Sequence, residues 1–286
     1  MFEEIIHVII HAVKDSVKLL PFLLITYILM EYIEHKMTDK SKSAIEKAGK
    51  FGPIIGGVVG AVPQCGFSVS ATNLFSSRVI TLGTLIAVYL STSDEMIPVL
   101  LSESISFSII LKLILIKVCI GMIAGLIIDF VLRKFSKNEE NKIAEMCEEE
   151  GCHCENGILK SAIKHTVNIF IYIFITTIIL NIIIELVGEE RLGSLILNKK
   201  IIGAIIAGII GLIPNCASSV IITQLYAKGL ITAGALLAGL LVGAGLGLLV
   251  LFKTNKNIKQ NMKIIILLYF IGIVCGIGFE LLGINL

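Results

Sequence analysis

Residues 61–75 read AVPQCGFSVSATNLF, and residues 212–226 read LIPNCASSVIITQLY. Each stretch places a proline, a carboxamide and a cysteine in a row inside an otherwise apolar run. Proline lacks a backbone N–H donor and clashes with the preceding helical turn, so a helix should break at Pro63 and again at Pro214. A helix break inside a membrane is tolerated only where it faces protein or a water-filled cavity. The two stretches therefore predict a specialised region, not ordinary membrane spans.

The composition predicts an all-α, polytopic protein of the cell membrane. Of the 286 residues, 56% are hydrophobic and only 16% are charged. Several apolar runs reach the roughly 20 residues that a spanning helix needs, so the lipid bilayer is the expected surrounding. The net charge of +2 gives no reason to expect a nucleic-acid partner. The sequence has no phosphate-binding glycine loop, so we expect a transporter driven by a proton or ion gradient, with no cofactor, and not an enzyme.

The chain is an internal repeat with an offset of 151 positions. Residues 52–90 and 203–241 align without a gap and are identical at 17 of 39 positions. Duplicated sets of hydrophobic spans are typical of transporters, in which the substrate site lies where the halves meet. We therefore divide the chain into a first repeat at 1–132, a charged linker at 133–165 and a second repeat at 166–286.

The distribution of lysine predicts that the repeats are inverted. The loops at 35–50 and 253–263 carry five and four lysines, and their repeat counterparts are less basic. Basic loops favour the cytoplasm, so each basic loop and its counterpart should lie on opposite sides of the membrane. Each half must then cross an odd number of times, and five crossings per half give about ten. Residues 51–101 could supply three short crossings, or one crossing with re-entrant half-helices.

Each half carries the same set of polar groups after its proline, and we expect the two sets to form one transport site. The predicted residues are Gln64, Cys65, Ser68 and Asn73 in the first half and Asn215, Cys216, Ser219 and Gln224 in the second. Carboxamide oxygens are hard metal ligands, and thiols are soft ones. The alternative is that the prolines are simple kinks and the cysteines are small apolar fillers.

Two further groups of residues are candidate metal ligands. The segment STSDE at 91–95 places Asp94 and Glu95 where the second repeat has the uncharged VGAGL. A carboxylate inside a membrane suggests a function, but a surface turn is the alternative. The linker contains Cys147, Cys152, His153 and Cys154, which could capture or sense a metal if the linker is not simply a solvated, acidic connection. Glycines at every fourth position, at 52, 56 and 60, at 121 and 125, and at 239, 243 and 247, predict close helix packing.

The two proline motifs, with STSDE between them, resemble the family of ten-span heavy-metal exporters, whose members are labelled either arsenic efflux proteins or manganese transporters. The resemblance implies ten spans and export of a metal or metalloid. The two family labels differ in substrate, and it is the carboxamides and the acid pair that favour a divalent cation such as manganese. The alternatives are an arsenite or metalloid carrier, a permease for a small solute, and a membrane metal sensor that does not transport. We also expect the chain to form homo-oligomers.

Overall fold

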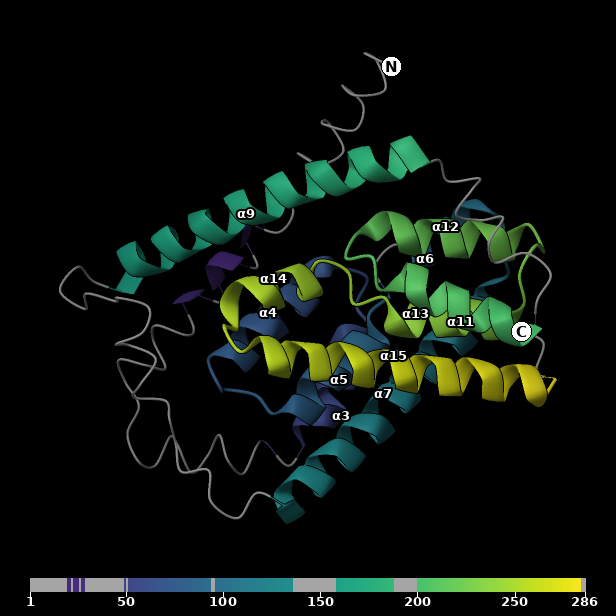
Figure 1. Ribbon diagram of the computed structural model, residues 1–286, viewed down its shortest axis with the longest axis horizontal. Coiled ribbons are helices and arrows are strands. Elements are labelled where there is room, and N and C mark those ends of the chain that lie inside the picture. The colour runs from purple at the N-terminus through teal and green to yellow at the C-terminus, as the bar shows by residue number, and fades with distance from the viewer. Residues whose placement is uncertain are drawn as a thin grey trace.

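The structure is a computed structural model that describes residues 20–21, 23–25, 27–28, 49, 51–93, 96–135, 158–187 and 200–283. Within these ranges the regular structure is helical, with no strand, which confirms the all-α part of the expected fold class. The helices, labelled in Figure 1, are α3 (Gly52–Gly60), α4 (Cys65–Ser76), α5 (Leu82–Ser91), α6 (Met96–Ser102), α7 (Phe107–Phe135), α9 (Ile158–Val187), α11 (Lys200–Gly211), α12 (Cys216–Ala227), α13 (Ala233–Val242), α14 (Gly247–Thr254) and α15 (Ile258–Leu281).

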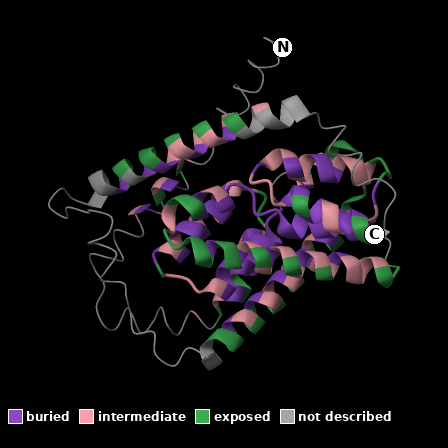
Figure 2. Cartoon of the chain, in the orientation of Figure 1, coloured by how far each residue is buried: buried purple, intermediate pink, exposed green. Residues whose placement is uncertain are grey.

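Five segments of the described chain are long and apolar enough to cross a membrane, and they fall into two kinds. Phe107–Leu132, Ala162–Ile179 and Ile258–Leu281 lie within single long helices. These helices expose apolar side chains along their outer faces, as lipid-facing helices do (Figure 2). Leu82–Ser102 and Ala233–Thr254 are interrupted, and they are mostly buried inside the protein. The interrupted spans therefore form the centre, and the continuous helices surround them.

The repeat seen in the sequence is also present in the helices. Four helices of the first half, α4, α5, α6 and α7, start at positions whose counterparts 151 residues later start α12, α13, α14 and α15. The packing repeats as well, because α3 and α7 pack on α5 in the same way as α11 and α15 pack on α13. The two halves also interlock: α4 packs on α14, and α12 packs on α6 (Figure 1).

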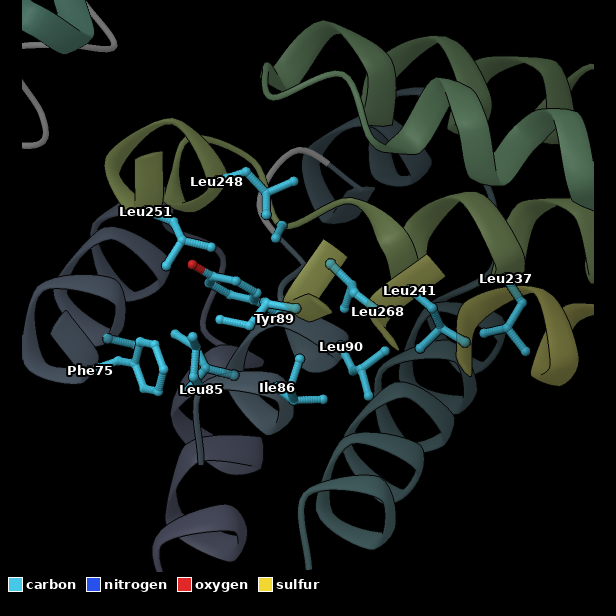
Figure 3. Close-up of a cluster of buried hydrophobic side chains, with 14 residues drawn as sticks. Phe75, Leu85, Ile86, Tyr89, Leu90, Leu237, Leu241, Leu248, Leu251 and Leu268 are labelled. Atoms are coloured by element: carbon cyan, nitrogen blue, oxygen red, sulfur yellow. The ribbon is translucent and has the colours of Figure 1, made fainter. Parts of the chain in front are cut away.

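Side chains from both halves share one apolar core. Tyr89 is fully buried in this cluster, close to Phe75 from α4 and Leu248 and Leu251 from α14 (Figure 3). Leu268, from α15, lies in the same cluster. Burying apolar area in a core common to both halves stabilises the contact between them as well as each half separately.

The glycine pattern brings helix backbones into contact, which confirms its predicted packing role. A Cβ atom at Gly121 of α7 would lie 2.8 Å from the carbonyl oxygen of Ala87 in α5. A similar contact in the second half involves Gly276 of α15, where a Cβ atom would lie 2.6 Å from the carbonyl oxygen of Gly234. Both distances are shorter than side chains allow, so only glycine fits at these positions.

Polar side chains fix the start of each interrupted span. The Thr81 hydroxyl accepts a hydrogen bond from the Thr84 backbone N–H, and Thr232 does the same for Ala235. The buried Asp129 carboxylate accepts a further hydrogen bond of 2.9 Å from the Gly83 N–H. A carboxylate beside a helix N-terminus stabilises the helix by meeting its free N–H groups and its dipole.

Replacement of Gly121 by alanine should destabilise the protein by about 1–3 kcal/mol, because the added methyl group overpacks the contact with α5. The matched control is Gly278→Ala in α15, where a Cβ atom would meet nothing within 4 Å. That change should be neutral, or stabilising by up to about 1 kcal/mol through helix propensity. Thermal unfolding of the purified protein in detergent measures both changes. Equal melting temperatures for the two variants would contradict the close packing of α7 on α5.

Candidate functional site

Both proline motifs lie where one helix ends and another begins. Pro63 falls between α3 and α4, and Pro214 falls between α11 and α12. The carboxamide residues Gln64 and Asn215 are the N-cap residues of α4 and α12, both with an extended backbone. Neither of their side chains caps its helix, so the carboxamides are not used in the usual N-cap hydrogen bond.

The first residues of α4 and α12 lie next to each other. Cys65 and Cys216 are repeat counterparts, and their sulfur atoms lie 3.4 Å apart. Both side chains are partly buried. The contact joins the two halves at the start of two helices, where backbone N–H groups are not used within the helix. The structure thus places two thiols that are 151 residues apart in sequence in direct contact with each other.

The other predicted residues of α4 and α12 lie at different distances from the thiol pair. The buried Ser68 hydroxyl donates a hydrogen bond of 2.9 Å to the carbonyl of Cys65, and Ser219 lies near the end of α13, where its hydroxyl is 3.4 Å from the Cβ position of Gly243. Asn73 and Gln224 each follow their cysteine by eight residues, which is about 12 Å along a helix. They are therefore too distant to bind one ion together with the thiols.

Asn73 instead belongs to a separate buried polar contact. Its side-chain oxygen lies 3.4 Å from the hydroxyl of Tyr27, which donates to it. The amide nitrogen of Asn73 is buried, and no described residue accepts a hydrogen bond from it. Asn73 therefore connects α4 to the segment that contains Tyr27 and is not part of the thiol site.

The predicted acidic segment follows a second helix break, between α5 and α6. Ser91, Thr92 and Ser93 are all buried, so the surface-turn interpretation is wrong for this part of the segment. Asp94 and Glu95 lie outside the described residues. The break adjoins the first proline motif, because a Cβ atom at Gly60 would lie 2.6 Å from the carbonyl oxygen of Val88, near the end of α5.

The corresponding break in the second half, at 243–246, is held by side chains from the first half. The hydroxyl groups of Tyr89 and Thr72 each donate to the Gly247 carbonyl at 3.2 Å, and they lie 2.5 Å from each other. Thr72 also lies 2.7 Å from the carbonyl of Ser68. This buried cluster connects α4, α5 and the start of α14.

The sequence analysis missed Lys117, which is fully buried within α7 and donates a hydrogen bond to the Thr92 carbonyl. It also did not identify Tyr89 or Thr72 as site residues. One signal for Lys117 was available: it is a single lysine in the apolar run LILIKVCI, and its repeat counterpart is the apolar Leu268. Partners for Tyr89 and Thr72 could not be read from the sequence, because the Gly247 carbonyl is a backbone group in the other half.

The linker residues Cys147, Cys152, His153 and Cys154 lie outside the described residues, so the linker metal site stays a prediction. Within the described ranges, no group of three or more His, Cys, Asp or Glu side chains is placed to hold a metal ion. A metal at the centre of this part of the chain would therefore depend on the two thiols, with carboxamide, hydroxyl or carbonyl oxygens as further ligands.

Comparison with known protein families gives one match. The model of the family described as "Putative, 10TM heavy-metal exporter" matches residues 4–189, which is more than half of the chain. Among curated proteins and solved structures, none matches the chain significantly.

Mild oxidation should join Cys65 to Cys216, because the two sulfur atoms need to move only from 3.4 Å to the roughly 2.05 Å of a disulfide bond. The measurement is peptide mass spectrometry of the oxidised, purified protein. Cys119 and Cys275 are internal controls, since they are also free thiols in the described chain. A cross-linked peptide that pairs Cys65 with either control residue, or no Cys65–Cys216 peptide at all, would contradict the observed geometry.

Proposed function

This chain belongs to the 10TM heavy-metal exporter family, and we propose that it exports a soft metal ion or metalloid, such as Cd²⁺ or arsenite, through a site between its two halves. The observation that carries this proposal is the contact between Cys65 and Cys216. Thiols prefer soft ions, and two thiols on one ion bind more tightly than either thiol alone.

The distance between the sulfur atoms suits a shared ion. Two thiolates on one tetrahedral ion, with metal–sulfur bonds of about 2.3 Å, lie about 3.8 Å apart. The observed separation of 3.4 Å differs from this by only a few tenths of an ångström. Gln64 and Asn215 directly precede the two cysteines in the sequence, and we propose their carboxamide oxygens as the third and fourth ligands.

The thiol pair changes the substrate preference that we predicted from the sequence. Manganese was favoured because carboxamides and the Asp94–Glu95 pair supply oxygen ligands, which hard cations prefer. In the structure, the two proline motifs meet through the sulfur atoms of Cys65 and Cys216, and Asn73 and Gln224 are distant from that contact. We therefore place thiophilic ions first and keep manganese as the alternative substrate.

We also propose that the halves are inverted repeats that together make ten crossings. Three observations support this arrangement: helix starts that recur at one offset, reciprocal packing of α4 on α14 and of α12 on α6, and the lysine-rich loops at 35–50 and 253–263. Inverted halves place equivalent helix breaks near the membrane midplane, where a carrier can expose one site to either side.

Replacement of Cys65 or Cys216 by serine should abolish export of Cd²⁺ and arsenite, because the sulfur ligand is lost while the shape of the side chain is kept. The double variant should be no worse than either single variant, since both thiols act on one ion. Uptake by inside-out vesicles, at equal protein levels, measures the rates. The matched control is Cys119→Ser, whose thiol is exposed on α7 and should be dispensable.

The same assay with Mn²⁺ tests the alternative substrate. Robust Mn²⁺ transport that both serine variants retain would replace the soft-ion proposal with the oxygen-ligand one. Normal Cd²⁺ and arsenite transport by both variants would show that the thiol pair is not the transport site.

Inversion of the repeats predicts that the counterpart positions Ser106 and Asn257 lie on opposite sides of the membrane. Both residues are exposed, next to the starts of α7 and α15. Single cysteines are introduced there in a chain whose seven native cysteines are replaced by serine, and cells are labelled with an impermeant maleimide. Asn257→Cys, in the basic loop, should be protected in intact cells, and Ser106→Cys should react. Reaction of both positions from the same side would make the repeats parallel.

A further inference from the structure

Three hydroxyl side chains lie one helical turn after another on one face of α4. They are Ser68, Thr72 and Ser76. This face contacts α14 of the second half, because the Thr72 hydroxyl lies 3.2 Å from the Gly247 carbonyl. One turn later, the Ser76 hydroxyl lies 2.7 Å from the hydroxyl of Thr254, at the end of α14. Since α4 begins at Cys65, the position of this thiol relative to the second half depends on the contact between α4 and α14.

Gly247, at the start of α14, is closely enclosed by side chains of the first half. A Cβ atom at Gly247 would lie 2.9 Å from Cε1 of Tyr89 and 3.2 Å from the Cβ of Ser68. Tyr89 is fully buried, close to Leu248 and Leu251 of α14 (Figure 3). The first half therefore contacts the start of α14 at a position that has no room for a side chain.

The Thr72 hydroxyl is the point at which α4 joins this cluster. It lies 2.5 Å from the Tyr89 hydroxyl of α5, and both hydroxyl groups lie 3.2 Å from the Gly247 carbonyl. The same Thr72 oxygen lies 2.7 Å from the Ser68 carbonyl, and the Ser68 hydroxyl donates to the Cys65 carbonyl at 2.9 Å. A continuous series of close polar contacts thus joins Cys65 to the second half.

The second half shows that the repeated fold does not require such a cluster. The counterpart of Thr72 is Thr223, which is also fully buried, but its hydroxyl donates to the Ser219 carbonyl within its own helix, at 2.6 Å. The counterpart of Tyr89 is Leu240, which has no hydroxyl group. The helix α12 packs on α6 in an apolar cluster. Apolar packing is not directional, whereas hydrogen bonds require a particular geometry and so fix the register of two helices.

We propose that Thr72 and Tyr89 are positioning residues of the transport site, whose hydroxyl groups fix α4 against α14 and so hold Cys65 opposite Cys216. Thr72 follows Cys65 by seven residues, which is about 10 Å of helix, so it acts through the placement of α4 and does not bind the ion. The consequence for transport rests on the proposed function. The effect on the contact between the two sulfur atoms does not depend on which ion is carried.

The test compares Thr72→Val, which removes the hydroxyl group and keeps the branched shape, with Thr72→Ser, which keeps the hydroxyl group. Thr223→Val is the matched control, because it removes a buried threonine hydroxyl at the equivalent position of the second half. The rate of Cys65–Cys216 cross-linking by hydrogen peroxide is measured by peptide mass spectrometry on the purified full chain, without metal. Thr72→Val should cross-link about two- to tenfold more slowly than the native chain, which is the range that one neutral hydrogen bond spans. Thr72→Ser and Thr223→Val should cross-link at the native rate.

Tyr89→Phe is a second, independent variant, since it removes the other hydroxyl group and keeps the ring in the apolar core. It should also slow cross-linking by about two- to tenfold. The double variant with Thr72→Val should be slowed by less than the product of the two single effects, because both hydroxyl groups act on one contact. In inside-out vesicles, each single variant should raise the KM for Cd²⁺ by a similar factor, since a smaller population of the binding-competent state lowers the apparent affinity.

Equal cross-linking rates in Thr72→Val, Tyr89→Phe and Thr223→Val would overturn the proposal. A Thr72→Ser rate as low as that of Thr72→Val would also overturn it, because the hydroxyl group would then not be responsible. So would a raised KM at a native cross-linking rate, since the effect would not pass through the thiols. A failure of the proposed function appears differently: cross-linking would depend on Thr72 as expected, while Cys65→Ser would transport Cd²⁺ normally.

Discussion

Helix ends inside the protein impose the constraint on which the rest of this structure depends. The helices α5 and α13 stop within their membrane-spanning segments, and lipid cannot satisfy the backbone groups left at such ends. Each end must find a partner inside the protein. At the two ends of α5, the Gly83 N–H meets Asp129 and the Thr92 carbonyl receives the ammonium of Lys117. After the break that follows α13, hydroxyl groups of α4 and α5 hold the Gly247 carbonyl at the start of α14. The continuous helices α7, α9 and α15 keep this polar centre away from lipid.

Interlocking of the halves follows from the same constraint. A half-helix is too short to bury its own ends, so α4 packs on α14 and α12 packs on α6, each against a helix of the other half. Backbones approach closely because glycine occupies the contact positions, as Gly121 does against Ala87. Contact between the repeat counterparts Cys65 and Cys216 places these thiols where the halves meet. A site at this position is sensitive to any shift of one half relative to the other, which is the motion a carrier requires.

The duplicated framework has diverged in its chemistry. Lys117 corresponds to Leu268, Tyr89 corresponds to Leu240, and the acidic residues at 94–95 correspond to glycine and leucine. The first half therefore supplies the buried lysine Lys117 and the two hydroxyl groups, of Tyr89 and Thr72, that hold the break of the second half. The second half contributes a glycine-rich break, in which Gly245 has a positive φ of 54° that favours glycine. The two breaks are thus unequal: one is held by an ion–dipole contact within its own half, and the other by neutral hydrogen bonds from the opposite half.

The sequence by itself determined the helical membrane class, the repeat and its offset, the glycine positions for close packing and the pairing of proline, carboxamide and cysteine in each half. These features depend on local composition and periodicity, which a single chain displays directly. Only the tertiary structure decided that Cys65 contacts Cys216 and that Tyr27 donates a hydrogen bond to Asn73. It also decided that Lys117 donates to the Thr92 carbonyl and Tyr89 to the Gly247 carbonyl. These contacts depend on which face each helix presents and on the register between helices, which follow from packing across the two halves. Backbone carbonyls, moreover, are common to all residues, so the sequence carries no mark of which carbonyl lacks a partner.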